Sequence, residues 1–179
     1  MNIKSILCVI VAVVCFTVAP LSTQAADCGC HSTALKAPTP AQFAQTVATI
    51  DMLEVRLGQI ALTNSSTPNV KKFGQRMITD HTKINKNLTA VAASQHIPLP
   101  TKLDAKHQAM VTKLSALKGA AFDNAYIPAM IAGHTQALAM FKNESATCTN
   151  PALKKFAKQT TPIIALHLRL AQIVQDSLK

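Results

Sequence analysis

The chain has 179 residues and a mass of 19.1 kDa, which is enough for one domain with a buried core and too little for two large domains. Apolar residues make up 49% of the sequence and charged residues 15%, with five glycines and no tryptophan, which excludes a disordered protein and favours helices over a turn-rich β-sandwich. The formal net charge is +10, which favours a solvated basic surface, with weak contact with an anionic envelope surface as the alternative.

The N-terminal segment, residues 1–26, has the parts of a secretory signal peptide. Lys4 supplies the positive charge, an apolar run extends from Ile6 to Ala19, and the small residues that end at Ala25 and Ala26 offer a cleavage site. The apolar run is shorter than the roughly 20 residues that a membrane-spanning helix needs. We therefore expect an exported protein that is periplasmic after cleavage.

Residues 27–40 are expected to form a cysteine-bearing arm before the helical domain. An oxidising compartment favours disulfides, so one expectation is a bridge from Cys148 to Cys28 or Cys30. Alternatively, Cys28, Cys30 and His31 hold a soft metal ion such as Cu(I), because two thiolates and an imidazole lie within four residues. The spacing is one residue short of the C-x-x-C-H motif that attaches haem.

Residues 41–179 carry apolar side chains at alternating spacings of three and four, which predicts amphipathic helices. Four of the predicted helices are long: the first runs from about Pro40 to Asn64, the second from Pro68 to just before Ile97, the third carries residues 127–141, and the fourth opens at Pro151. A shorter helix is expected from about Lys102 to Lys118, closed by Gly119.

The lengths of the connections predict the topology. Helices joined by a few residues are antiparallel neighbours, which applies to the first and second long helices and to the third and fourth. More than 20 residues, including the short helix, separate the second from the third. We therefore predict an all-α, ferritin-like four-helix bundle with a short connector helix in the crossover between helices two and three.

Each predicted long helix has one strongly polar residue where its apolar pattern calls for a hydrophobic one. These four residues are Glu54, His81, His134 and His167. Each is near the middle of its helix, so all four are expected in one layer. Three imidazoles and a carboxylate suit a single Zn, Fe, Mn or Cu ion. The alternative is a buried hydrogen-bonded network that only fixes the packing.

Several runs resemble a family of exported, ferritin-like bacterial proteins of unknown function. They are residues 54–61 (EVRLGQIA), 70–81 (VKKFGQRMITDH) and 122–126 (FDNAY), with His134, Pro162 and His167–Leu168. The resemblance covers roughly residues 41–175 and implies a ferritin-like fold and export. It also supports the choice of Glu54, Asp80, His81, Asp123, Tyr126, His134 and His167. It implies no reaction.

Three further polar residues, Asp80, Asp123 and Tyr126, are expected to hydrogen bond the ligands and orient the imidazoles rather than bind the ion. The Glu-x-x-His pairs of di-iron ferritins do not occur in the sequence, so ferroxidase activity is not expected. The sequence contains no recognised catalytic motif and no nucleic-acid-binding motif. Two functional hypotheses follow: a periplasmic metal-binding protein, or a non-catalytic envelope or stress-related interaction domain with a structural polar layer.

Overall fold

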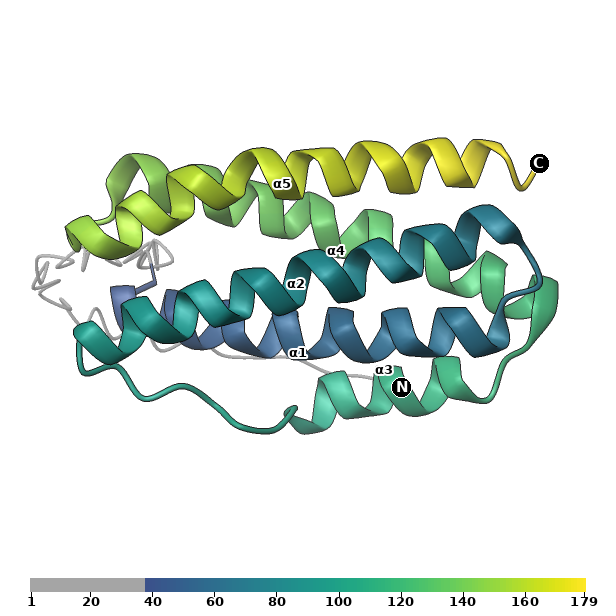
Figure 1. The fold of residues 1–179 in the computed structure, drawn as a ribbon, viewed down its shortest axis with the longest axis horizontal. Helices are drawn as coiled ribbons and strands as arrows, with labels where there is room; N and C mark the ends of the chain where they lie inside the picture. The colour runs from purple at the N-terminus through teal and green to yellow at the C-terminus, as the bar shows by residue number, and fades with distance from the viewer. Residues whose placement is uncertain (1–37) are drawn as a thin grey trace, which may run out of the picture. The chain divides into compact units, whose positions relative to one another are not determined.

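The structure is a computed structural model that describes residues 38–179, and within that range the chain forms helices and no strands (Figure 1). The helices are α1 (Pro40–Asn64), α2 (Pro68–Ser94), α3 (Ala105–Ser115), α4 (Gly119–Thr147) and α5 (Pro151–Asp176). The all-α fold class is therefore as predicted, with four long helices and one short helix. The predicted signal peptide and the residues Cys28, Cys30 and His31 lie outside the described residues.

Local sequence signals set the ends of the long helices. α1, α2 and α5 each have a proline in the first turn, where the missing N–H costs no helical hydrogen bond. Thr39 and Gln42 form a capping box at the start of α1, in which each side chain accepts from the backbone N–H of the other. Asn150 caps α5 by accepting from the backbone N–H of Leu153. The α5 boundary follows the sequence prediction.

Thr67 precedes α2 but makes no capping hydrogen bond with its side chain. Its hydroxyl instead donates to Oδ2 of Asp123 at 2.6 Å. This bond ties the start of α2 to the first turns of α4, which the sequence pattern did not predict because the two residues are far apart in the chain.

The connector helix α3 is shorter than predicted. Asp104 begins it by accepting from the backbone N–H of His107, and the helix ends at Ser115. Gly119, which was expected to close this helix, has a φ of +55° and is the first residue of α4. Glycine adopts this left-handed conformation without a steric penalty, so the chain can turn sharply into α4.

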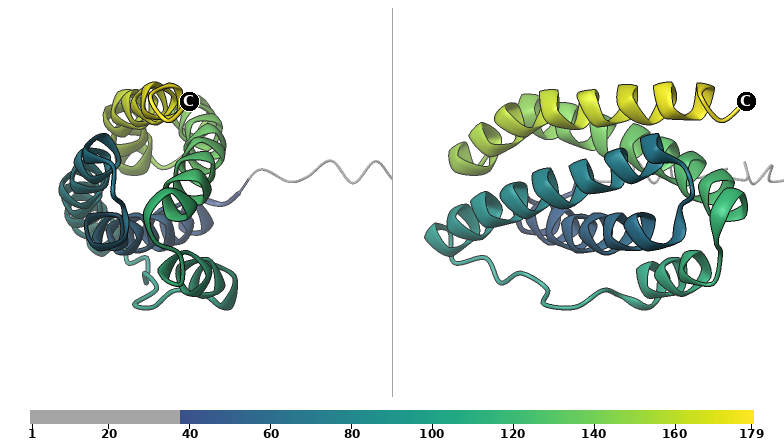
Figure 2. Two further views of the ribbon diagram at one scale, coloured as in Figure 1. Left: turned by 90° about the vertical axis from the view of Figure 1, so that its right-hand side faces the viewer. Right: turned by 45° about the vertical axis from the view of Figure 1, so that its right-hand side comes forward.

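The long helices run side by side, and α3 lies outside them against α1 (Figures 1 and 2). The pairs α1–α2 and α4–α5 are joined by short loops and pack along their lengths. α1 and α2 approach each other closely at two glycines: a Cβ on Gly58 would lie 2.6 Å from the carbonyl oxygen of Gly74. No helix in the described part of the chain is long and apolar enough to cross a membrane.

The core consists of two apolar clusters. One contains Phe73, Phe122 and Tyr126, and the other contains Phe43 and Phe141. Phe43 and Phe141 pack edge to face with ring centroids 5.3 Å apart. On each long helix the change from one cluster to the other occurs at the level of the predicted polar residue. The polar residues therefore lie between two dry, tightly packed layers.

Candidate metal centre

Four buried polar side chains meet between these apolar clusters, one from each long helix. Glu54 comes from α1, His81 from α2, His134 from α4 and His167 from α5, and the exposed fractions are 4%, 1%, 2% and 0%. One ring nitrogen of each histidine lies within 4.8 Å of a ring nitrogen of each of the other two. The structure therefore brings together three imidazoles from residues that are far apart in the sequence.

His134 has a tautomer that its hydrogen bond dictates. Its Nδ1 lies 2.9 Å from the backbone carbonyl oxygen of Met130, one turn earlier in α4. A carbonyl oxygen only accepts hydrogen bonds, so Nδ1 carries the proton and donates it. In the neutral ring, Nε2 is then left with a lone pair.

The side chain of His167 is hydrogen bonded to Asp80, which also pairs with Arg76. Nε2 of His167 lies 2.9 Å from Oδ2 of Asp80, and Arg76 donates from Nε to the same oxygen. Partial burial disfavours the charged carboxylate, but the hydrogen bonds from His167 and Arg76 outweigh it and lower the pKa of Asp80. The ionised Asp80 therefore accepts from Nε2, and Nδ1 of His167 carries the lone pair.

His81 pairs with a residue that the sequence analysis did not select. Its Nδ1 shares a 2.8 Å hydrogen bond with Oδ1 of Asp51 in α1, and both side chains are buried. Burial raises the pKa of Asp51 well above its usual value. Asp51 lies one turn before Glu54 on the same face of α1, so the spacing marks it as a second acidic residue of that face but does not show that it contacts α2.

The second nitrogen of each ring has no hydrogen-bond partner among the described residues. These atoms are Nε2 of His81, Nε2 of His134 and Nδ1 of His167, and all three are buried. A buried polar atom without a partner is costly and is uncommon in folded proteins. Nε2 of His134 and Nδ1 of His167 carry lone pairs, and Nε2 of His81 carries one when its Nδ1 donates to Asp51. Three such atoms on neighbouring rings therefore indicate a site for a bound group.

Two of the imidazoles are kept neutral by their surroundings. Burial lowers the pKa of His81 to about 4, against the opposing effect of the Glu54 carboxylate. Burial also lowers the pKa of His167 to about 4, although its hydrogen bond to Asp80 acts in the other direction. Neutral imidazole is the form that coordinates metal ions, so these rings need not lose a proton to bind one at neutral pH.

Glu54 adds a carboxylate to the layer. Its Oε2 is buried and has no hydrogen-bond partner among residues 38–179. A Cβ placed on Gly133 of α4 would lie 3.9 Å from its Oε1, so Oε1 faces that helix. Three neighbouring imidazoles with a carboxylate in the same layer resemble the donor sets that proteins use for transition metals.

The remaining predicted residues lie at different distances from this group. Asp80 contacts His167 directly, whereas Asp123 accepts its hydrogen bond from Thr67. Tyr126 is fully buried, and burial together with the charge of Glu54 raises its pKa well above the usual value. Cys148 is buried between α4 and α5, and its thiol donates to the carbonyl oxygen of Asn150.

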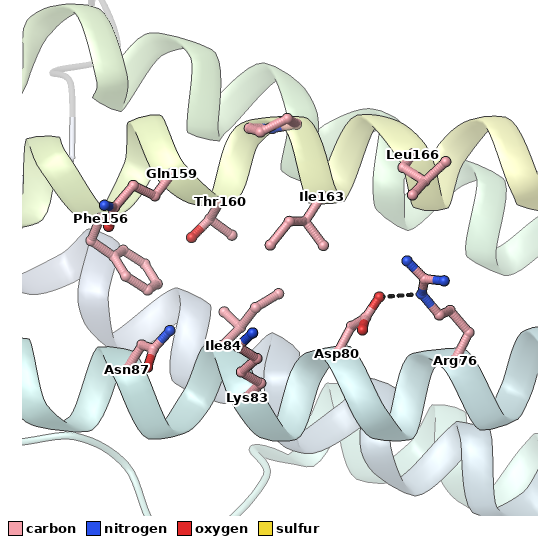
Figure 3. Close-up of a pocket in the computed structure, with 11 residues that line it drawn as sticks. Arg76, Asp80, Lys83, Ile84, Asn87, Phe156, Gln159, Thr160, Ile163 and Leu166 are labelled. Atoms are coloured by element: carbon pink, nitrogen blue, oxygen red, sulfur yellow. Dashed lines mark hydrogen bonds and ion pairs between the residues drawn. The ribbon is translucent and has the colours of Figure 1, made fainter.

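Two cavities approach the site from opposite sides. One, of about 570 Å³, lies between α1, α3 and α4 and is lined at its inner end by Glu54, His81 and His134. The other, of about 370 Å³, lies between α2 and α5 and is lined by Asp80 and Arg76 among others (Figure 3). The first cavity reaches two of the imidazoles, and the second reaches the carboxylate that holds the third.

Solved structures share this fold. A secreted DUF305 protein from Streptomyces coelicolor matches with a TM-score of 0.66 at 15% identity, over 78% of this chain and 92% of that chain. CopM in its Cu(I)-bound form matches with a TM-score of 0.63 at 17% identity, over 78% of this chain and 97% of that chain. CopM in its Cu(II)-bound form matches with the same TM-score and coverage at 20% identity.

The sequence comparisons point to one family. No curated protein matches the sequence. The family model described as a domain of unknown function, DUF4142, matches residues 26–174. This match spans most of the sequence and contains all four long helices except the last residues of α5. The chain therefore belongs to the DUF4142 family of domains of unknown function.

Proposed function

We propose that the protein binds a single transition-metal ion through His81, His134 and His167, with Glu54 as a fourth donor. The proposal rests on one observation: in each of the three imidazole rings one nitrogen is fixed by a hydrogen bond, and the other nitrogen is buried and has no partner among the described residues. Ligating histidines in metalloproteins have this arrangement, because the fixed nitrogen sets the tautomer and the orientation of the ring. In this proposal Asp51 and Asp80 are the residues that orient two of the ligands.

Copper is the first ion to test. CopM, which shares the fold, has been solved with Cu(I) and with Cu(II), and imidazole is a good ligand for both oxidation states. Zn, Mn and Fe remain in the set to be compared, since a histidine and carboxylate site also accepts them. Asp123 and Tyr126 would support the layer from the side of α4.

We further propose that the four long helices form a ferritin-like bundle and that the mature protein is exported to the periplasm. The short loops within the pairs α1–α2 and α4–α5, and the long crossover that contains α3, support the ferritin-like topology. The signal-peptide pattern of residues 1–26 supports export. Export would place the metal site in a compartment where metal availability differs from that of the cytoplasm.

The test is thermal unfolding of the metal-free protein with added Cu, Zn, Mn and Fe ions. All measurements use the C28S/C30S variant, so that Cys28 and Cys30 of the N-terminal arm cannot bind the added ion. A ligand that binds only the native state stabilises it by about 2.7 kcal/mol at a concentration of 100 Kd. We expect one ion to raise the unfolding midpoint of this protein, Glu54→Gln to weaken the effect, and His134→Phe to abolish it. His96→Asn is the matched control, because it removes a histidine outside the layer.

The alternative is that the polar layer only fixes the packing. In that case no ion shifts the midpoint of the C28S/C30S protein, and this protein carries no metal as purified. His134→Phe would then destabilise the fold by about 1–3 kcal/mol, because it leaves buried polar groups unpaired. The absence of any midpoint shift together with the absence of metal in the purified protein would overturn the metal-binding proposal.

A further inference from the structure

The cavity between α1, α3 and α4 connects the polar layer with the outside of the molecule. At its inner end lie Glu54, His81 and His134, and its outer part includes the exposed residues Ala132 and Gln136. A buried site needs a path by which its ion enters, and this cavity ends at two imidazoles and the carboxylate.

Gly133 of α4 keeps this path open beside Glu54. A Cβ at Gly133 would have Oε1 of Glu54 at 3.9 Å and no other side-chain or distant backbone atom within 4 Å. The space in front of the carboxylate is therefore empty because residue 133 has no side chain. Alanine would fit there, but a longer side chain would lie between the cavity and Glu54.

Two thioethers and one further imidazole line the same cavity. Met110 and His107 come from the connector α3, and Met140 comes from α4. Nδ1 of His107 is engaged by Asp104 at 2.7 Å, which leaves Nε2 as the other nitrogen of the ring. Thioether sulfur is a soft ligand that prefers Cu(I) to Zn(II) or harder ions.

The cavity on the opposite side is less suited to a cation, because two positive side chains line it, whereas Lys106 alone among lysines and arginines lines the cavity between α1, α3 and α4. It is lined by Arg76 and Lys83, and Arg76 is paired with Asp80, the residue that hydrogen bonds His167 (Figure 3). A cation on this side would meet two positive side chains and an occupied carboxylate.

We propose that Cu(I) reaches the histidine site through the cavity between α1, α3 and α4, past the thioethers of Met110 and Met140, and that Gly133 keeps this entrance open. This inference rests on the proposed function, because it assigns the entry route of the ion that the site binds. It adds a role for α3, which covers the entrance rather than only connecting two long helices.

The test separates the rate of loading from affinity at equilibrium. Cu(I) is supplied to the C28S/C30S protein from a coloured chelator under anaerobic, reducing conditions, and its transfer is followed by stopped-flow absorbance. Gly133→Leu is compared with Gly133→Ala, since both remove the glycine but only leucine fills the entrance. We expect Gly133→Leu to take up Cu(I) at least about tenfold more slowly than Gly133→Ala, which corresponds to a small increase in the activation free energy of entry. Its final affinity should match that of Gly133→Ala.

The thioethers are tested with Met110→Leu/Met140→Leu, a substitution that nearly conserves volume. We expect this variant to load Cu(I) more slowly than the C28S/C30S protein and to load Zn(II) at the same rate. Equal loading rates for Gly133→Leu and Gly133→Ala would overturn the route, and an unchanged Cu(I) rate in the methionine variant would overturn the role of the thioethers. Absence of any bound ion in the C28S/C30S protein at equilibrium would instead overturn the proposed function itself.

Discussion

The hydrogen bond on one nitrogen of each imidazole decides what the other nitrogen can do. For His167 the acceptor of that bond is Asp80, whose charge is stabilised in turn by Arg76. These hydrogen bonds connect Arg76 on the surface of α2, through Asp80, to the buried ring of His167 in α5. Removal of a residue that orients a ligand typically weakens metal affinity by about 10-fold to 100-fold.

We therefore predict that Asp80→Ala weakens metal binding by about 10-fold to 100-fold, because His167 loses the acceptor that fixes its tautomer. Arg76→Ala keeps that acceptor and is expected to have a smaller effect. Competition titration with a metallochromic chelator measures both affinities. An affinity for Asp80→Ala equal to that of the wild type would show that His167 needs no orienting partner.

The two depressed histidine pKa values predict how the metal-free protein responds to acid. His81 and His167 have a pKa of about 4 in the folded state and about 6.5 in the unfolded chain. Between pH 6.5 and 4 these two residues bind more protons in the unfolded state, so their contribution to the free energy of unfolding falls as the pH falls through this window. Each residue contributes at most about 3 kcal/mol to this loss.

Urea unfolding of the metal-free protein between pH 7.5 and pH 4 measures this effect. The double variant His81→Gln/His167→Gln is the control, because its free energy of unfolding should depend less steeply on pH in the same window. A dependence as steep in the variant as in the wild type would mean that other groups cause the acid sensitivity.

At the scale of single residues, the sequence predicted which histidines are buried in the polar layer, but it did not predict all of their hydrogen-bond partners. The apolar periodicity marks His81, His134 and His167 because each interrupts a hydrophobic pattern. Asp51 was missed, since a period of three to four cannot tell which of two acidic residues one turn apart faces a neighbouring helix. Its pairing with His81 depends on how α1 and α2 pack, which is a tertiary contact.

At the scale of helices, the contact between α1 and α2 depends on small residues. A Cβ on Gly58 would lie 2.6 Å from the carbonyl oxygen of Gly74, and a Cβ on Gly74 would lie 2.7 Å from Cβ of Ala61. Both distances are shorter than non-bonded atoms tolerate. The two helices would have to separate to accept a side chain, and this would disturb the pairing of Asp51 with His81.

We predict that Gly58→Ala lowers the free energy of unfolding by about 1–3 kcal/mol, because overpacking outweighs the better helix propensity of alanine. Gly133→Ala is the matched control at a helical glycine with room for a methyl group. It is expected to be neutral or to stabilise the fold by up to about 1 kcal/mol. Urea unfolding of both variants gives the comparison, and equal stability would contradict the close approach of α1 and α2.

Helix boundaries could be predicted where the signal is local. Asn150 followed by Pro151 opens α5, and Pro68 opens α2, as the sequence indicates. The connector helix was predicted too long at both ends. Asp104 caps it by accepting from the backbone N–H of His107, so the helix begins at Ala105 and not at Lys102. The polar residues at its ends follow the helical pattern only weakly. The hydroxyl of Thr67, which precedes α2, donates to Asp123 across the fold and does not cap its own helix.

At the scale of the whole molecule, the described fold is two apolar clusters separated by one polar layer. The clusters supply the burial that holds the four long helices together, so the polar layer is free to carry a function. Composition and periodicity were sufficient to predict the all-α class. The sequence could not predict the cavity between α1, α3 and α4, because its existence depends on where α3 packs.

The cysteines give a prediction for the full chain. We predict that exported protein contains a disulfide between Cys148 and either Cys28 or Cys30, and that reduction changes the unfolding midpoint little, because strain can cancel much of the entropic gain. Burial raises the pKa of the Cys148 thiol, so its oxidation is expected to be slow. Peptide mapping without reductant identifies the link, and an unlinked Cys148 in such material would contradict it.

The central claim is that the three histidines together hold one metal ion. Elemental analysis combined with X-ray absorption of the copper-loaded C28S/C30S/C148S protein, prepared without residues 1–26, tests this claim most directly, because removal of Cys8 and Cys15 with that segment leaves no thiol to bind the ion. We predict one copper per chain with imidazole nitrogen as the main ligand, and no bound copper in the same protein with His81→Gln/His134→Gln/His167→Gln. Copper that stays bound after these three substitutions, or a C28S/C30S/C148S protein that binds none, would contradict the account.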